Sequence, residues 1–132
     1  MEVALATIAA RYRIRLILVF GSAVTGRVHP QSDVDLAVLF DRSEFSSQEC
    51  ADLIGDLQGL FPDREVDLGI INHADPLFLK KITEHCEILY GPVAELQRLR
   101  IYAFKRYVDH AKYFAMERDF AAKFVATASA HP

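Results

Sequence analysis

Two aspartates, Asp33 and Asp35, stand in the run DVDLAVLF (33–40), which is otherwise apolar. An apolar run of this length predicts a buried strand, and strand side chains alternate between the two faces of a sheet. Both carboxylates therefore project from the same face, where they can share divalent cations and repel each other without them. Mg²⁺ suits such a pair, because it prefers oxygen ligands and keeps positions open for phosphate oxygens.

Gly21 and Ser22 follow a second apolar run, IRLILVF (14–20), and ten residues separate them from Asp33. Glycine lets the backbone approach a ligand closely, and a serine hydroxyl beside free backbone N–H groups can bind an anion. A phosphate-binding turn that leads into a pair of metal-binding carboxylates suits phosphoryl or nucleotidyl transfer. Arg27 and His29 lie in the loop between the phosphate-binding turn and the carboxylate pair. Each could contact phosphate or be a solvent-exposed loop residue.

A third carboxylate is predicted in REVDLGII (64–71), a further strand in which Glu65 and Asp67 share one face. We favour Asp67, because it lies deeper in the strand, where an acidic residue is harder to explain as a solvent-facing one. Its predicted role is to hold one metal ion and to accept the proton of an attacking hydroxyl.

The remaining pattern alternates helices with strands, which predicts a single domain of the α/β (α+β) class. From Val93 to about Ala126 there is no helix breaker, and one straight helix of that length would be about 50 Å long. It must either bend into two helices or project and contact another chain. Further helices are predicted over 2–12, 46–59 and 75–85, and strands over 14–20, 33–40, 64–71 and 87–90.

Composition narrows the class of protein. The 132 residues fit one domain, and an apolar share of 52% predicts a folded globule. The net charge of −3 argues against a protein that wraps nucleic acid. Cys50 and Cys86 lack the number and spacing of a disulfide framework or zinc site, which favours reduced thiols. We expect a cytoplasmic protein with neither a signal peptide nor a membrane span, because arginines interrupt the first apolar stretch.

The stretch GSAVTGRVHPQSDVDL (21–36) resembles the signature of the DNA polymerase beta-like nucleotidyltransferases, Gly-Ser followed after ten residues by Asp-x-Asp. The whole chain resembles the minimal nucleotidyltransferase (MNT) proteins, including a closing helical segment, LRIYAFKRYVDHAKYF (99–114). This resemblance implies a polymerase beta-like fold with a small mixed sheet flanked by helices. It also implies a catalytic core over 1–92 and a helical segment over 93–132 that packs on the core or on a partner.

MNT proteins are commonly the antitoxins of type VII HEPN/MNT toxin–antitoxin pairs. Their known activity is transfer of AMP from ATP to a tyrosine hydroxyl of the HEPN ribonuclease toxin. By this resemblance, Gly21 and Ser22 would bind the triphosphate, Asp33 and Asp35 would ligate two Mg²⁺ ions, and Asp67 would ligate one ion and act as the base. The expected partners are ATP and a HEPN toxin, with a hetero-oligomer among the assemblies allowed. No membrane or direct nucleic-acid binding is expected.

Two rival functions stay open. A nucleotidyltransferase that modifies a small molecule, such as an antibiotic, usually needs an extra helical domain, for which this chain has little room. A non-catalytic antitoxin would instead mask the toxin by binding it. The aromatic residues of the C-terminal segment exceed what a small core needs and favour a protein interface there: Tyr102, Tyr107, Tyr113 and Phe114.

Overall fold

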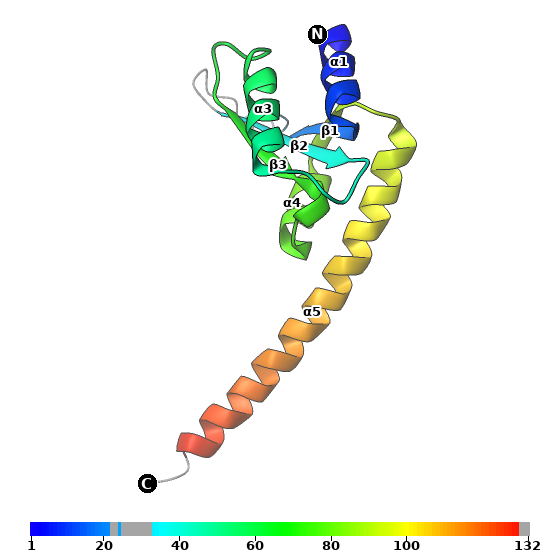
Figure 1. Cartoon of the computed structure of the whole chain (residues 1–132). Helices are drawn as coiled ribbons and strands as arrows, with labels where there is room; N and C mark the ends of the chain where they lie inside the picture. The colour runs from blue at the N-terminus through cyan, green and yellow to red at the C-terminus, as the bar shows by residue number, and fades with distance from the viewer. Residues whose placement is uncertain (22–23, 25–32, 130–132) are drawn as a thin grey trace.

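A four-stranded sheet lies between two groups of helices in the computed structural model, which describes residues 1–21, 24 and 33–129 (Figure 1). The sheet has the order β3-β2-β1-β4. Strand β1 pairs antiparallel with β2 and β4, whereas β2 and β3 are parallel, so the predicted mixed sheet is confirmed. The strands are β1 (Ile14–Phe20), β2 (Val34–Phe40), β3 (Val66–Ile70) and β4 (Cys86–Tyr90).

The helices divide between the two faces of the sheet. Helices α1 (Glu2–Tyr12) and α3 (Ser47–Gln58) cover one face, and α4 (Pro76–Glu84) with the first turns of α5 (Val93–Ser129) covers the other. Along β2 the residues alternate between these two cores, with Leu36 and Val38 toward α1 and α3 and Ala37 toward α4 and α5. Because Asp35 is two residues before Ala37, its carboxylate lies on the α4/α5 face.

Local sequence signals set the helix ends as predicted. Ser46 caps α3, with its hydroxyl accepting from the Glu49 backbone N–H at 3.1 Å in a complete capping box. Asp75 caps α4, with its carboxylate accepting from the Phe78 N–H at 2.8 Å just before Pro76. Helix α1 ends at Arg13, which adopts a left-handed conformation with φ 57°.

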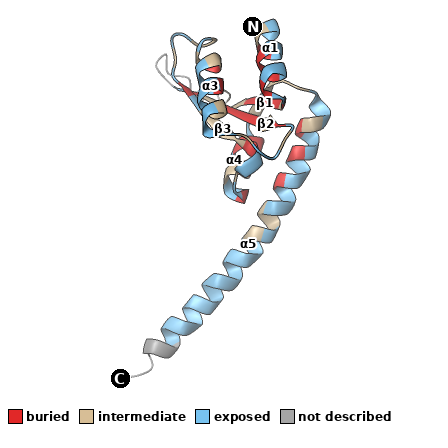
Figure 2. Cartoon of the chain, in the orientation of Figure 1, coloured by how far each residue is buried: buried red, intermediate tan, exposed pale blue. Residues whose placement is uncertain are grey.

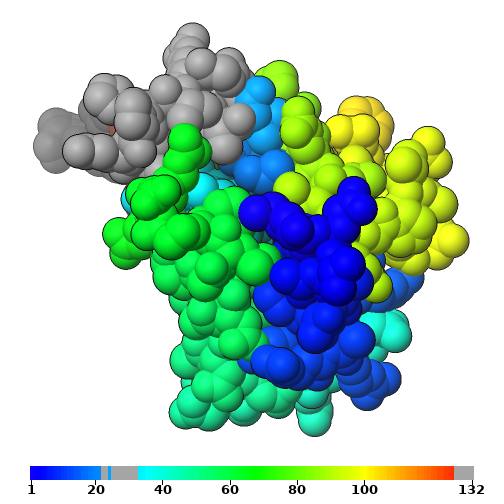
Figure 3. Space-filling model, turned by 90° about the horizontal axis from the view of Figure 1, so that it is seen from above, coloured from blue at the N-terminus to red at the C-terminus, as the bar shows by residue number. Residues whose placement is uncertain are grey.

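Helices α1 and α3 lie against each other on their shared face of the sheet (Figure 3). The Tyr12 hydroxyl donates to the Asp56 carboxylate at 2.5 Å, and Arg11 pairs with the same carboxylate at 3.0 Å. Burial, followed by the charge and hydrogen bond of Asp56, raises the pKa of the Tyr12 phenol. This contact joins the two helices at the edge of their common apolar core.

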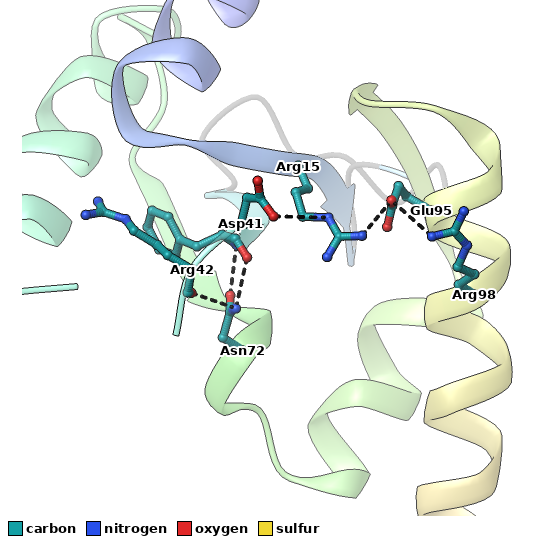
Figure 4. A network of polar contacts seen from close by, with 7 residues as sticks. Arg15, Asp41, Arg42, Asn72, Glu95 and Arg98 are labelled. Carbon is teal, nitrogen blue, oxygen red and sulfur yellow. Dashed lines mark hydrogen bonds and ion pairs between the residues drawn. The ribbon is translucent and has the colours of Figure 1, made fainter. Parts of the chain in front are cut away.

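Asn72, in the short helix η1 (Ile71–His73), extends the pairing of β2 and β3 beyond the end of β3 (Figure 4). The Phe40 N–H donates to Asn72 Oδ1 at 2.9 Å, and Asn72 Nδ2 donates to the Phe40 carbonyl at 3.1 Å. The side-chain amide therefore satisfies both backbone groups of Phe40, as a neighbouring strand would.

Arg15 forms ion pairs at the same end of the sheet as Asn72. It pairs with Glu95 at 2.7 Å and with Asp41 at 3.9 Å, and Glu95 also pairs with Arg98 at 3.6 Å (Figure 4). These contacts connect the start of β1 to the end of β2 and to the first turn of α5. The hydrogen bond and charge of Glu95 raise the pKa of the Arg15 guanidinium, which stays protonated.

Helix α5 is a single helix of 37 residues that projects away from the sheet, so the predicted alternative of a bend into two helices is wrong (Figures 1 and 2). Leu96, Leu99 and Ala103 are buried against the sheet and α4. Every residue from 111 to 126 is exposed. None of the described helices combines the length and hydropathy needed to span a bilayer.

We predict that Asn72→Ala lowers the free energy of unfolding by about 1–3 kcal/mol, because it leaves the Phe40 peptide groups without partners. Urea denaturation followed by circular dichroism measures this. Gln48→Ala is the matched control, since that exposed amide donates to Asp52 on its own helix, at 2.9 Å, and has no other hydrogen bond among the described residues. Equal losses in the two variants would contradict the role given to Asn72.

Candidate active site

Asp35 and Asp67 lie directly opposite each other in the parallel ladder of β2 and β3. Neighbouring strands are about 4.8 Å apart, so side chains on the same face at paired positions are neighbours. Asp35 is half-buried, whereas Asp67 is exposed. Two predicted carboxylates from distant parts of the sequence thus meet at one end of the sheet, on the face that α4 and α5 cover.

Electrostatic repulsion acts on Asp35. Burial raises the pKa of the Asp35 carboxyl, and the negative charges of Asp67 and, more weakly, Asp33 raise it further. The positive charge of Lys81 on α4 opposes this rise. A cation placed between such carboxylates removes the repulsion that raises the pKa, so it would bind here favourably.

Gly21 holds the turn after β1 against the Asp35 carboxylate. Its neighbour Phe20 pairs with Asp35 in the ladder of β1 and β2, and Gly21 itself has φ +75°. A Cβ atom built on Gly21 would overlap Asp35 Oδ2 and stand 3.3 Å from its Cγ. Only glycine combines this backbone conformation with so close an approach. The Val24 N–H donates to the Gly21 carbonyl at 3.1 Å.

The structure therefore brings together Gly21, Asp35 and Asp67. Asp33 is exposed and stands just before Val34, the first residue of β2, so the strand predicted over 33–40 begins one residue later than expected; the charge of Asp33 still acts on Asp35. Glu65 likewise precedes β3, and its carbonyl accepts from the Val34 N–H at 2.8 Å. The predicted phosphate-binding Ser22, together with Arg27 and His29, lies outside the described residues.

Sequence reasoning missed Lys81. It adjoins Lys80 in the run LFLKKITEH (77–85), and nothing in the sequence distinguishes the two. In the structure Lys80 pairs with Glu84 and lies over the Tyr107 ring at 4.9 Å, whereas Lys81 acts on Asp35. The distinction depends on how α4 docks against the sheet, which no local signal reports.

The donor set at this end of the sheet fits Mg²⁺, although within the described residues no three acidic, histidine or cysteine side chains form a complete cluster. Mg²⁺ is commonly held by one or two carboxylates and completes its octahedron with water and substrate phosphates. Asp35 and Asp67 supply carboxylate oxygens from adjacent strands, and the Gly21 backbone packs directly against the Asp35 carboxylate. A preformed cage of protein ligands is therefore unnecessary.

Several solved structures share this fold over nearly the whole chain. A chain from a toxin–antitoxin structure with AMP-PNP matches with a TM-score of 0.70 and 20% identity, covering 95% of this chain and 98% of that one. A chain from the tri-AMPylated Shewanella oneidensis HEPN toxin in complex with MNT antitoxin matches with a TM-score of 0.64 and 18% identity, covering 95% of each. At these identities the likeness is one of fold.

Sequence comparison gives the family. No curated protein sequence matches the chain. The family model described as polymerase beta, nucleotidyltransferase matches residues 4–93, which contain all four strands together with Gly21, Asp33, Asp35 and Asp67. This match spans well over half of the 132 residues. The chain therefore belongs to the polymerase beta nucleotidyltransferase family.

Proposed function

We propose that this chain is the antitoxin of a type VII HEPN/MNT pair and that it adenylylates its toxin. In this reaction it transfers AMP from ATP to a tyrosine hydroxyl of the cognate HEPN ribonuclease and releases pyrophosphate. The observation that carries the proposal is the register of Asp35 against Asp67 beside Gly21, in a chain of a nucleotidyltransferase family.

Two further findings support the choice of nucleotide and partner. One of the similar structures is a toxin–antitoxin with AMP-PNP, and another contains a tri-AMPylated HEPN toxin with an MNT antitoxin. Both match 95% of this chain, which is more than its sheet and the helices on it, and this favours the same class of partner. A separate substrate domain, which a small-molecule nucleotidyltransferase would use, has no counterpart among the described elements.

In the proposed transfer of AMP, the three carboxylates would bind the metal ions and accept a proton. Asp33 and Asp35 would hold both Mg²⁺ ions, and Asp67 would share one of them. The bound ions would supply charge neutralisation for the attacking and leaving oxygens. Asp67 would accept the tyrosine hydroxyl proton as that oxygen forms its bond to the α-phosphorus. The bond from the α-phosphorus to the pyrophosphate oxygen breaks, with no covalent intermediate on this chain.

A second candidate, masking without catalysis, is favoured by the long exposed part of α5. Its apolar side chains would bury a large surface on binding. Masking and adenylylation are compatible, since a docked toxin would also present its tyrosine. They differ in whether neutralisation of the toxin survives the loss of Asp33 and Asp35.

We predict that the HEPN toxin encoded beside this chain gains one or more AMP units on incubation with the wild-type protein, ATP and Mg²⁺. Intact-mass spectrometry measures the gain. Asp33→Asn with Asp35→Asn should reduce the rate by at least about 10²-fold, because ligands of the ions are lost. Asp67→Asn should do the same.

Glu65→Gln is the matched control for Asp67→Asn, because Glu65 is the neighbouring acid that precedes β3. It should retain near wild-type transfer. Loss of activity in Glu65→Gln with retention in Asp67→Asn would move the third carboxylate to Glu65. A silenced toxin without added mass would leave masking as the function.

Asp35→Asn should raise the unfolding temperature at pH 7, because it removes a carboxylate whose charged form is disfavoured in the folded state. The folded pKa of Asp35 is above its unfolded value, so the folded state binds more protons between those values. Stability is therefore lost as pH rises through this window, and ionised Asp35 costs stability at pH 7.

Differential scanning fluorimetry measures this effect. Below the usual carboxyl pKa of about 3.9 the two proteins should converge. With Mg²⁺ and AMP-PNP, the wild type should gain stability and Asp35→Asn should gain much less. An Asp35→Asn variant that is no more stable at pH 7 would contradict the repulsion described for this site.

The toxin-binding surface is predicted on α5. Tyr113, Met116, Phe120 and Phe124 follow helical spacing along one face, and each is more than half exposed. Phe120→Asp should weaken toxin binding at least about tenfold in calorimetric titration, since a charge would replace an aromatic side chain that becomes buried in the complex. Ala122→Asp is the control, because Ala122 lies on the opposite side of the exposed helix. Equal weakening would exclude a contact specific to this face.

A further inference from the structure

The path of α4 brings its last turn to the carboxylate end of the sheet. After β3 the chain turns through η1, and α4 then leads into β4, whose first residue, Cys86, pairs with Phe20. Phe20 also pairs with Asp35 on its other side. The C-terminal end of α4 is therefore level with Asp35, across the width of β1.

Lys81 lies in this last turn of α4. It is three residues after Phe78, so the two side chains occupy neighbouring positions on the helix surface. The Phe78 ring packs on Phe20, with ring centroids 5.9 Å apart, and abuts Gly69, two residues beyond Asp67. The side of α4 that carries Phe78 and Lys81 thus lies over β1 and β3, next to both carboxylates.

Other cations close to α4 have different partners. Lys80, about 100° further round α4, pairs with Glu84 and lies over Tyr107 of α5. Arg100 of α5 donates from Nε to the Thr83 carbonyl at 3.2 Å, where it caps the end of α4. Within the described part of the chain the Lys81 ammonium makes no ion pair or hydrogen bond of its own, and its side chain is exposed.

We propose that Lys81 binds the β- and γ-phosphates of the nucleoside triphosphate and holds the pyrophosphate portion as it leaves. This inference rests on the proposed function, which puts a triphosphate beside Asp35 and Asp67. The ammonium is a compact positive charge with three N–H donors on a flexible stem, which suits a phosphate oxygen. The packing of the neighbouring Phe78 on Phe20 and Gly69 places this charge on the face of the sheet that carries Asp35 and Asp67.

The test is calorimetric titration of the whole protein with AMP-PNP and with AMP, both in the presence of Mg²⁺. Lys81→Ala should weaken AMP-PNP binding about 10- to 100-fold, the range for loss of a charged hydrogen bond. Its affinity for AMP, which lacks the β- and γ-phosphates, should stay near that of wild type. Lys81→Arg should restore most of the AMP-PNP affinity, since it keeps the charge and the donors.

Lys80→Ala is the matched control, because it removes an adjacent lysine from the same helix without changing the flank beside the carboxylates. It should bind AMP-PNP as the wild type does. Wild-type affinity for AMP-PNP in Lys81→Ala, or equal losses for AMP-PNP and AMP, would overturn the inference and leave the proposed function in place. If the wild-type protein itself binds no AMP-PNP, the proposed function fails and the inference fails with it.

Discussion

The register of β2 against β3 is the constraint on which the candidate site depends. It sets Asp35 opposite Asp67, and a slip of one residue along β3 would turn the paired side chain to the α1/α3 core. An unpaired carboxylate would be costly there. The register is supported at both ends, by the Glu65 carbonyl bonded to the Val34 N–H and by the Asn72 amide bonded to Phe40. Backbone pairing thus determines which carboxylates can act together.

The repulsion between these carboxylates is tolerated because the apolar packing around them is extensive. Leu36 and Val38 are fully buried between the sheet and α1 with α3, and Leu18 and Ala37 are fully buried on the opposite face. Burial of that apolar surface is the dominant favourable term in folding, and it offsets a local electrostatic cost at the sheet end. The sheet therefore holds Asp35 ionisable and half-buried, an environment in which cation binding changes its energy strongly.

Local features of the fold could be predicted from the sequence, and contacts between distant segments could not. The apolar strand that carries Asp35, the cap formed by Ser46 and Glu49, and the Asp75-Pro76 helix start each depend on a few neighbouring residues. The pairing of Asp35 with Asp67 and the different roles of Lys80 and Lys81 depend on strand register and on how α4 docks. Sequence also left α5 undecided, because dense apolar residues without a breaker are compatible with burial and with projection.

The way in which α5 is held gives it the geometry of a lever arm. Only the N-terminal part of the described helix is packed in the core, through Leu96, Leu99 and Ala103, and the helix continues to Ser129. At 1.5 Å per residue, the part beyond Ala103 is roughly 40 Å long. A slight tilt where the helix meets the sheet is therefore magnified into a displacement of several ångströms at the tip. A change in the packing of α5 against α4 would therefore move the distal aromatic residues more than it moves the buried ones.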